Sequence, residues 1–237
     1  MSALNDPALV AREYADETAL SARIAAQKAQ SGTDPWNVAF GAVAEAEPRT
    51  ILEVGPGRGE FAQRLRRELG ADVVAVDQSP RMVELTRQRG VEAVVGDVQD
   101  LPFRDGVFDC AVAAWMLYHV PELGRALREL RRVLRPNGRL VAVTNSARTM
   151  PELWDVLPGT TSRADGFSAE NGEGALLRWF TIVERRDVRG SVTFDDRDAA
   201  HRYVSASPRW SHLADYLPFF DGPLVTTRHV VVFVCEP

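Results

Sequence analysis

The chain has 237 residues, of which 45% are hydrophobic and 26% are charged, and its formal net charge is −5 at pH 7. This composition is typical of a globular protein with one substantial core, and the acidic balance gives no electrostatic footprint for nucleic acid. The 2 cysteines lack CxxC spacing, the 4 histidines are scattered, and no segment approaches the roughly 18 apolar residues of a membrane helix. We therefore expect a cytoplasmic protein without a metal, which binds neither nucleic acid nor a membrane.

The first part of the chain is predicted to be helical. Apolar residues recur at helical spacing over residues 2–30, a Ser-Gly-Thr-Asp-Pro sequence at 31–35 interrupts them, and a second helix is expected at about 36–46. No repeat or low-complexity linker follows, so the rest of the chain is expected to form one compact unit.

The next stretch joins a predicted buried strand to a glycine-rich turn. Residues 51–54 are mostly aliphatic, Gly55, Gly57 and Gly59 follow at alternate positions, and residues 60–69 repeat apolar side chains at helical spacing. Glycine lets the backbone approach a ligand closely, and the start of a helix offers free N–H groups to acceptors. The turn therefore predicts a nucleotide-type ligand.

The spacing of this turn separates two kinds of ligand. The dinucleotide fingerprint places its third glycine three residues after the second, where this chain has Glu60. A Tyr-x-x-x-Lys pair is also absent, because Lys28 is the only lysine. An NAD-dependent oxidoreductase is thus a disfavoured alternative. Glu53 instead places a carboxylate two residues before the first glycine.

Three further strands are predicted at residues 73–77, 91–95 and 108–114, and each is followed by residues able to bind a ligand. Asp77 ends the first of them, about twenty residues beyond the glycine turn, where a carboxylate accepts hydrogen bonds from ribose hydroxyls in nucleotide-binding α/β units. Ser79 is the better candidate for the cap of the following helix, because it precedes a proline.

Five stretches, taken together, resemble the class I S-adenosylmethionine-dependent methyltransferases. They are Glu-x-Gly-x-Gly-x-Gly at 53–59, the aspartate at 77, Gly-Asp followed by Leu-Pro-Phe at 96–103, Tyr-His-Val-Pro at 118–121, and Leu-Arg-Pro-Asn-Gly-Arg-Leu at 134–140. The resemblance covers about residues 50–146 and is to the small-metabolite group (methyltransferase type 11), which includes quinone and menaquinone C-methylating enzymes. The chain lacks the Asn/Asp-Pro-Pro-aromatic run of enzymes that methylate DNA bases.

This resemblance implies an α/β fold of Rossmann type, with a seven-stranded, mostly parallel sheet, helices on both faces and an antiparallel last strand. It also implies that residues 1–47 form a helical cap over the domain at 48–237, in which 147–224 carry substrate-facing insertions. Further strands are expected at 182–187, 190–194 and 225–235, of which 230–234 is a candidate exposed edge between subunits. Asn137 or Gly138 is expected to end the helix before it in the left-handed conformation.

The resemblance also implies a cofactor site for S-adenosylmethionine, without a metal. The residues assigned to it are Glu53, Gly55, Gly57, Gly59, Asp77, Gln78, Met82, Asp97, Val98, Ala113, Ala114 and, from the cap, Tyr14. Among these, Met82 and Tyr14 have core packing as an alternative role. Trp115, Glu170 and Asn171 are candidate substrate contacts, and helix capping is the alternative for the last two.

The implied reaction is in-line displacement of a methyl group onto an oxygen, nitrogen or carbon of a small molecule. His119 is the candidate general base, with Tyr118 second, but a base is needed only if the acceptor must lose a proton. The alternatives are a protein that binds the cofactor without methyl transfer, as a rearrangement catalyst or a regulatory module, and the oxidoreductase. A monomer or a homodimer is expected.

Overall fold

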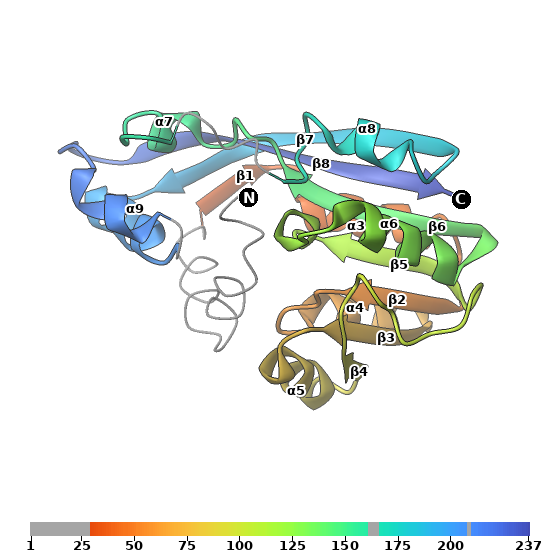
Figure 1. Ribbon diagram of the computed structural model, residues 1–237. Helices are drawn as coiled ribbons and strands as arrows, with labels where there is room; N and C mark the ends of the chain where they lie inside the picture. Colours follow the sequence, from red (N-terminus) through yellow and green to blue (C-terminus); the bar gives the residue numbers. More distant parts are fainter. Residues whose placement is uncertain (1–28, 161–165, 208–209) are drawn as a thin grey trace.

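The computed structural model describes residues 29–160, 166–207 and 210–237, and its centre is a single eight-stranded sheet (Figure 1). The strand order is β1-β7-β8-β6-β5-β2-β3-β4. The strands are β1 (Ala29–Gly32), β2 (Thr50–Val54), β3 (Asp72–Asp77), β4 (Glu92–Val95), β5 (Phe108–Ala114), β6 (Leu134–Asn145), β7 (Ile182–Phe194) and β8 (Leu224–Glu236). The predicted α/β class is confirmed, but the predicted count of seven strands is wrong.

The parallel half of the sheet consists of β6, β5, β2, β3 and β4. In β2 and β5 the aliphatic residues are buried, because helices cover both faces of these central strands. The strands predicted near 51–54, 73–77, 91–95 and 108–114 are all present. Their carboxyl ends meet at one edge of the sheet, where ligands of open α/β sheets bind.

The last strand runs antiparallel to its neighbours, as predicted. β8 pairs with β6 on one side and with β7 on the other. Residues 230–234 are buried in the interior of the sheet, so the expectation that they form an exposed edge is wrong. The strands predicted at 182–187 and 190–194 are one continuous strand, β7.

The additional strand, β1, lies where the sequence predicted the end of a helix and the break after it. It pairs antiparallel with β7, and Gly32 lies opposite Gly190. The guanidinium of Arg228, from β8, donates to the carbonyl oxygens of Ser31 at 3.3 Å and Thr33 at 2.7 Å. This short strand is therefore held by contacts with residues that are distant in the sequence.

Replacement of Gly190 by alanine should disrupt the attachment of β1. A Cβ at this position would overlap the Ser31 carbonyl oxygen and would lie 2.8 Å from the Arg228 guanidinium, so we expect the unfolding free energy to fall by about 1–3 kcal/mol. Urea denaturation measures the change. Gly41→Ala is the control: no atom lies within 4 Å of its added Cβ, and alanine in a helix should raise stability by about 0.5–1 kcal/mol. Equal stability of Gly190→Ala and wild type would contradict this packing.

Helices cover both faces of the sheet, as predicted. The α-helices are α3 (Pro35–Ala44), α4 (Glu60–Leu69), α5 (Pro80–Gln88), α6 (Leu123–Val133), α7 (Pro151–Trp154), α8 (Gly172–Leu176) and α9 (Arg197–Ser205), and the 3₁₀ helices are η2 (Leu117–His119) and η3 (Ser211–Tyr216). Buried residues of α3, α4 and α5 pack on one face, and those of α6 and α8 on the other. The first 28 residues of the proposed cap lie outside the described residues. Among the described helices, none is both long and apolar enough to cross a membrane.

The end of α6 differs from its prediction. Neither Asn137 nor Gly138 adopts a positive φ; instead the backbone becomes extended at Leu134, with ψ 141°, and enters β6 at once. Leu134 pairs with Phe108 of β5. Strand pairing therefore takes the place of the expected left-handed helix cap.

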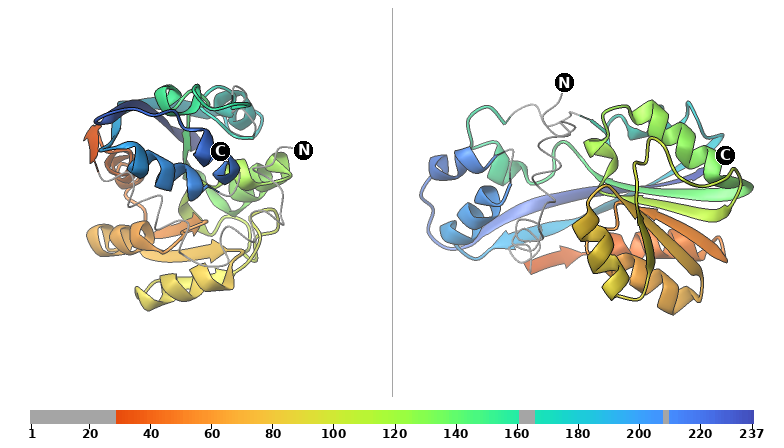
Figure 2. Two further views of the ribbon diagram at one scale, coloured as in Figure 1. Left: turned by 90° about the vertical axis from the view of Figure 1, so that its left-hand side faces the viewer. Right: turned by 60° about the horizontal axis from the view of Figure 1, so that its bottom comes forward.

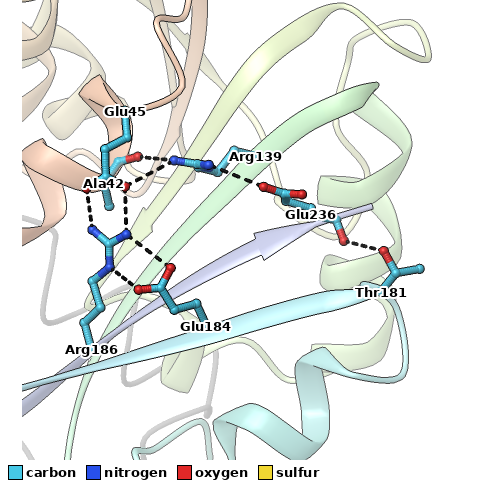
Figure 3. A network of polar contacts seen from close by, with 7 residues as sticks. All are labelled: Ala42, Glu45, Arg139, Thr181, Glu184, Arg186 and Glu236. Atoms are coloured by element: carbon cyan, nitrogen blue, oxygen red, sulfur yellow. Dashed lines mark hydrogen bonds and ion pairs between the residues drawn. The ribbon is translucent and has the colours of Figure 1, made fainter.

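A network of charged side chains attaches α3 to three strands on one side of the molecule (Figure 3). The Arg186 guanidinium donates to both carboxylate oxygens of Glu45, at 2.9 and 2.7 Å, and also to Glu184. Arg139 donates to the Ala42 carbonyl oxygen at 3.0 Å and to the Glu236 carboxylate at 3.3 Å. The hydrogen bond from Arg186 holds the pKa of Glu45 below its usual value.

The paired strands β7 and β8 extend beyond the parallel strands and carry α9 at their far end (Figures 1 and 2). A separate apolar cluster forms there, from α7, α9, η3 and the ends of the two strands. Trp154, Phe194 and Tyr203 belong to this cluster and are buried. Part of the region 147–224 thus has a small core of its own, on the side toward which the carboxyl ends of the parallel strands point.

Candidate functional site

A cavity lies at the carboxyl ends of β2, β3 and β5 and encloses about 630 Å³, part of it open solvent. Its lining residues are Val54, Gly55, Gly57, Val76, Asp77, Gln78, Gly96, Val98, Trp115, Met116, His119 and Val120. They come from the glycine turn and from the segments that follow the next strands. The wall is therefore largely apolar with a few polar groups, which is the usual composition of a small-molecule site.

The glycine turn has the backbone shape that only glycine adopts without strain. Gly55, Gly57 and Gly59 have φ values of 66°, 56° and 79°. A Cβ on Gly55 would lie 2.8 Å from the Cβ of Met116, another lining residue. Gly59 caps α4, and a Cβ there would lie 2.9 Å from the Cα of Thr86, so its role is to let α4 and α5 approach each other.

Glu53 is a buried carboxylate beside this turn. Its exposed fraction is 2%, and its Oε2 has no hydrogen-bond partner among the described residues. Burial, as the largest cause, and the nearby carboxylates of Asp77 and Glu60 together raise its pKa to about 8. A buried acceptor without a partner is costly, so the site favours a ligand that brings a cation or a hydrogen-bond donor.

Asp77 ends β3 and lines the cavity. Its Oδ1 accepts a hydrogen bond from the Ser79 backbone N–H at 2.8 Å. Burial raises the pKa of Asp77 to about 6, although backbone hydrogen bonds from Ser79, Gly57 and Gln78 act to lower it. Ser79 caps α5 by accepting from the Met82 N–H at 3.3 Å, as predicted, so Asp77 remains available to a ligand.

The segment after β4 contributes Gly96 and Val98 to the cavity wall. Asp97 lies between them but is not a lining residue. Its carboxylate accepts from the Gln99 backbone N–H at 2.8 Å, from the Gln99 side chain at 2.9 Å and from the Gln78 side chain at 3.5 Å. These contacts orient the Asp97 carboxylate and the lining residue Gln78 toward each other.

The segment after β5 forms the other side of the cavity. Trp115 has a φ of +53°, which is strained for a non-glycine residue, and its indole N–H donates to the Asn145 side-chain oxygen at 3.0 Å. Met116 and His119 follow and also line the cavity. The Tyr118 ring packs against the His119 ring with centroids 4.5 Å apart, but Tyr118 does not reach the wall.

Several predicted site residues do not line the cavity. They are Glu53, Gly59, Met82, Asp97, Ala113, Ala114, Tyr118, Glu170 and Asn171. Met82 is fully buried, and Ala113 and Ala114 are buried in β5. Tyr14 lies outside the described residues.

Glu170 and Asn171 hold loops together. The Glu170 carboxylate accepts from the Ser146 hydroxyl at 2.5 Å and from the Ala147 backbone N–H at 3.0 Å. The Asn171 side chain accepts from the Ser168 N–H at 2.8 Å and donates to the Gly166 carbonyl at 2.6 Å. These contacts join loops, and the Asn171 side chain makes no cap hydrogen bond to α8, so the structure supports neither the capping role nor a place in the cavity wall.

The sequence analysis did not single out five lining residues. They are Val54, Val76, Gly96, Met116 and Val120. Val54 and Val76 are signalled only by their position at the end of a predicted strand, whereas Gly96 and Val120 belong to the Gly-Asp and Tyr-His-Val-Pro stretches without having been assigned to the site. Within the described ranges, no group of three His, Cys, Asp or Glu side chains is placed to hold a metal ion.

Comparison with known proteins identifies the class. Residues 52–142, which contain the glycine turn, Asp77 and His119, match the methyltransferase domain family. The resemblance to the class I S-adenosylmethionine-dependent methyltransferases of the type 11 group, seen in the sequence, is therefore confirmed over this part of the chain.

Individual relatives include two named enzymes. The chain is 32% identical over 168 residues to the demethylmenaquinone methyltransferase of Thermotoga maritima, a match that covers 70% of this chain and 64% of the relative. It is 34% identical over 130 residues to the malonyl-[acyl-carrier protein] O-methyltransferase of Pseudescherichia vulneris, covering 53% of this chain and 51% of the relative. The chain thus spans less than two thirds of the length of these relatives.

Solved structures share the fold at lower identity. The crystal structure of the [4+2]-cyclase SpnF has a TM-score of 0.65 and 19% identity, over 96% of this chain and 95% of that one. The Haemonchus contortus phosphoethanolamine N-methyltransferase 2, in complex with phosphomonomethylethanolamine and S-adenosylhomocysteine, has a TM-score of 0.64 and 15% identity, over 100% of this chain and 61% of that one. These similarities establish the fold alone.

Proposed function

We propose that the protein transfers the methyl group of S-adenosylmethionine to an oxygen, nitrogen or carbon of a small molecule. The observation that carries the proposal is the buried Glu53 carboxylate, which has an unpartnered oxygen beside a glycine turn and a cavity. A ligand with a cationic amine next to a nucleoside satisfies this carboxylate and also suits the carboxylate of Asp77. The chain's own residues therefore fit this cofactor.

Each end of the cofactor has candidate residues. Glu53 would bind the ammonium group, directly or through water, and the backbone at Gly55 and Gly57 would hold the methionine end, with a further contact from the carbonyl oxygen of Ala113 or Ala114. Asp77 would accept hydrogen bonds from the ribose hydroxyls.

The nucleoside end has a second set of residues. Val98 would pack on the adenine, and Asp97 would accept from its amine after a small rearrangement of its contacts with Gln78 and Gln99. Gln78 lines the cavity between them. Gly59 would support this wall from behind, because it lets α4 and α5 approach each other, and Met82 would do so as a fully buried residue of α5.

The cofactor, when bound, supplies an electrophilic methyl group for in-line displacement. The protein's part is to bind, to exclude water and to hold the acceptor in line, and such positioning supplies roughly 7–11 kcal/mol of the reduction in barrier. His119 lines the cavity and would accept a proton from an acceptor that must lose one, with Tyr118 as the weaker candidate. Trp115 would contact the acceptor.

Two alternative functions make different predictions for ligand binding and methyl transfer. A protein that binds the cofactor without methyl transfer would share the whole cofactor site. An NAD-dependent oxidoreductase is disfavoured further, because the side chain at the third dinucleotide position, Glu60, pairs with Arg58 at 2.6 Å and Arg89 at 2.8 Å.

The test is thermal unfolding with S-adenosylhomocysteine, S-adenosylmethionine or NAD present. A ligand at about 100 times its dissociation constant adds ~2.7 kcal/mol of stability, which raises the melting temperature by roughly 5–10 °C in a protein of this size. We expect both adenosyl compounds to produce this shift and NAD to produce none. Asp77→Ala should abolish the shift, whereas Asp72→Ala, an exposed residue at the other end of β3, should preserve it.

Methyl transfer is then measured by incorporation of labelled methyl groups into a panel of small molecules. Cofactor binding without transfer to any member of a broad panel would support the non-methylating alternative. A shift with NAD alone, or none with either adenosyl compound, would overturn the proposed function.

A further inference from the structure

Two tryptophan rings lie side by side at one end of the cavity. The ring centroids of Trp36, at the start of α3, and Trp115, after β5, are 4.6 Å apart, and that of Phe61 lies 4.8 Å from the centroid of Trp36. Trp115 lines the cavity, and Trp36 keeps an exposed fraction of 38%. Trp36 is not itself a lining residue, so the pair joins the aromatic wall of the cavity, which is Trp115, to a partly exposed indole.

Trp115 is fixed from two directions. Its backbone, in the left-handed conformation, donates to the Val143 carbonyl oxygen at 2.9 Å, and its indole N–H donates to Asn145 at 3.0 Å. Strained conformations of this kind persist where the surrounding structure imposes them, and they occur often at ligand sites. The indole of Trp115 is therefore held at a set angle to the cavity.

Trp36 is fixed by the attachment of β1. The Asp34 carboxylate caps α3 by accepting from the Trp36 backbone N–H at 3.0 Å. Arg228 holds the preceding carbonyl group, that of Thr33, at 2.7 Å. The position of this exposed ring thus depends on β1 and β8, and so on contacts outside the cofactor site.

The order of the strands places Trp115 on the side of the cavity from which the methyl acceptor would approach. β5 lies on one side of β2, whereas β3 and β4 lie on the other. The proposed nucleoside contacts, Asp77 and Val98, follow β3 and β4, so the methyl acceptor approaches from the side of β5. Within the part of the chain that the structure describes, no arginine or lysine lines the cavity, and the carboxylate of Asp77 disfavours an anion.

Resting on the proposed function, we propose that Trp36 and Trp115 bind the methyl acceptor and select one with a planar, uncharged aromatic ring. An aromatic ring gains specific offset or edge-to-face contacts with an indole that a saturated ring of the same size does not. Trp36 then determines specificity although it is distant in the sequence from the cofactor motifs.

The test compares two matched probes on the protein saturated with S-adenosylhomocysteine. Calorimetric titration with 2-naphthol and with its saturated counterpart, decahydro-2-naphthol, gives the preference for an aromatic ring. Wild type should prefer 2-naphthol by about fivefold, the size expected for one or two aromatic contacts. Trp36→Leu should reduce this preference to below about twofold, and Trp36→Phe should retain most of it. Phe219→Leu, which removes a ring that is 86% exposed elsewhere, is the control and should not alter the preference.

Affinity for S-adenosylhomocysteine should be the same in all four proteins, which shows that each variant is folded. Equal binding of both probes by wild type, binding of neither, or an unchanged preference in Trp36→Leu would overturn the aromatic selectivity while leaving the proposed function intact. If wild type does not bind S-adenosylhomocysteine, the proposed function fails, and the acceptor site fails with it.

Discussion

Replacement of Glu53 by glutamine is expected to make the folded protein more stable at alkaline pH while it weakens cofactor binding. The pKa of Glu53 is raised from 4.5 to about 8 by burial first and then by the charges of Asp77 and Glu60. The folded protein therefore keeps a proton that the unfolded chain releases above pH 4.5. The stability that this group contributes is complete below pH 4.5 and is lost as the pH rises toward 8.

The measurement is the unfolding free energy as a function of pH. The pKa of Asp77 is also raised, to about 6, so this group likewise lowers the unfolding free energy as the pH rises from 3.8 to 6. A comparison of unfolding free energies above pH 6 therefore isolates the effect of Glu53. Between about pH 6.5 and 8.5 wild type should lose roughly 2 kcal/mol, and Glu53→Gln should lose little. Glu92→Gln, at an exposed residue of β4, controls for the removal of one negative charge and should behave as wild type.

The same variant should bind S-adenosylhomocysteine about 10- to 100-fold more weakly, because a neutral amide replaces a charged partner of the ammonium group. Isothermal titration at about pH 8.5, the upper end of this pH range, measures this loss. Unchanged affinity, or a pH profile parallel to that of wild type, would show that Glu53 is not the ammonium partner or that it is not protonated in the free protein.

Replacement of Gly55 by alanine is expected to close the methionine end of the cavity. Gly55 has a φ of 66°, and an added Cβ would lie 2.8 Å from the Cβ of Met116 and 3.0 Å from its Cγ. Gly70 has the same φ, but no atom lies within 4 Å of its added Cβ. Alanine in the left-handed conformation lowers the unfolding free energy of each variant by about 1–2 kcal/mol. Only Gly55→Ala also displaces a side chain of the cavity wall.

Gly70→Ala should therefore lose stability by this amount and bind S-adenosylhomocysteine as wild type does. Gly55→Ala should lose a further 1–3 kcal/mol or so from overpacking and at least about tenfold in affinity. Urea denaturation and calorimetric titration of both variants give the two differences. If the variants match in stability and affinity, the contact with Met116 does not shape the site.

The parallel half of the sheet was predictable because its signals are local. Strands β2 and β5 are runs of aliphatic residues buried on both faces, and such runs need no information from distant parts of the chain. The glycine turn and Asp77 were predictable for a related reason. Their roles depend on backbone conformation and on position at the end of a strand, which both follow from spacing.

The errors lie where a distant partner decides the structure. β1 has the sequence Ala-Gln-Ser-Gly, without an apolar alternation, and becomes a strand because β7 and Arg228 hold it. Leu134 continues into a strand because Phe108 pairs with it. Residues 230–234 have the same composition at an edge or in the interior, so their sequence does not specify which strands flank them.

The sequence predicted some residues of the candidate site and missed others for the same reason. Its polar groups and glycines belong to recognisable motifs, but Val54 and Val76 line the cavity as ordinary apolar residues. Trp36 was not singled out, since its contact with Trp115 joins residues that lie far apart in the sequence. The proposed acceptor side is built by tertiary packing and has no motif of its own.

The position of β8 also has a consequence for the order in which the protein is assembled during synthesis. β8 is the last strand along the chain, and it separates β7 and β1 from the parallel strands. Until residues 224–236 have left the ribosome, β7 and β1 have no strand through which to join the rest of the sheet. The glycine turn and Asp77 can form in the nascent chain, whereas Trp36 reaches its final place only after synthesis of β8. We therefore expect cofactor recognition to precede acceptor recognition as the chain folds.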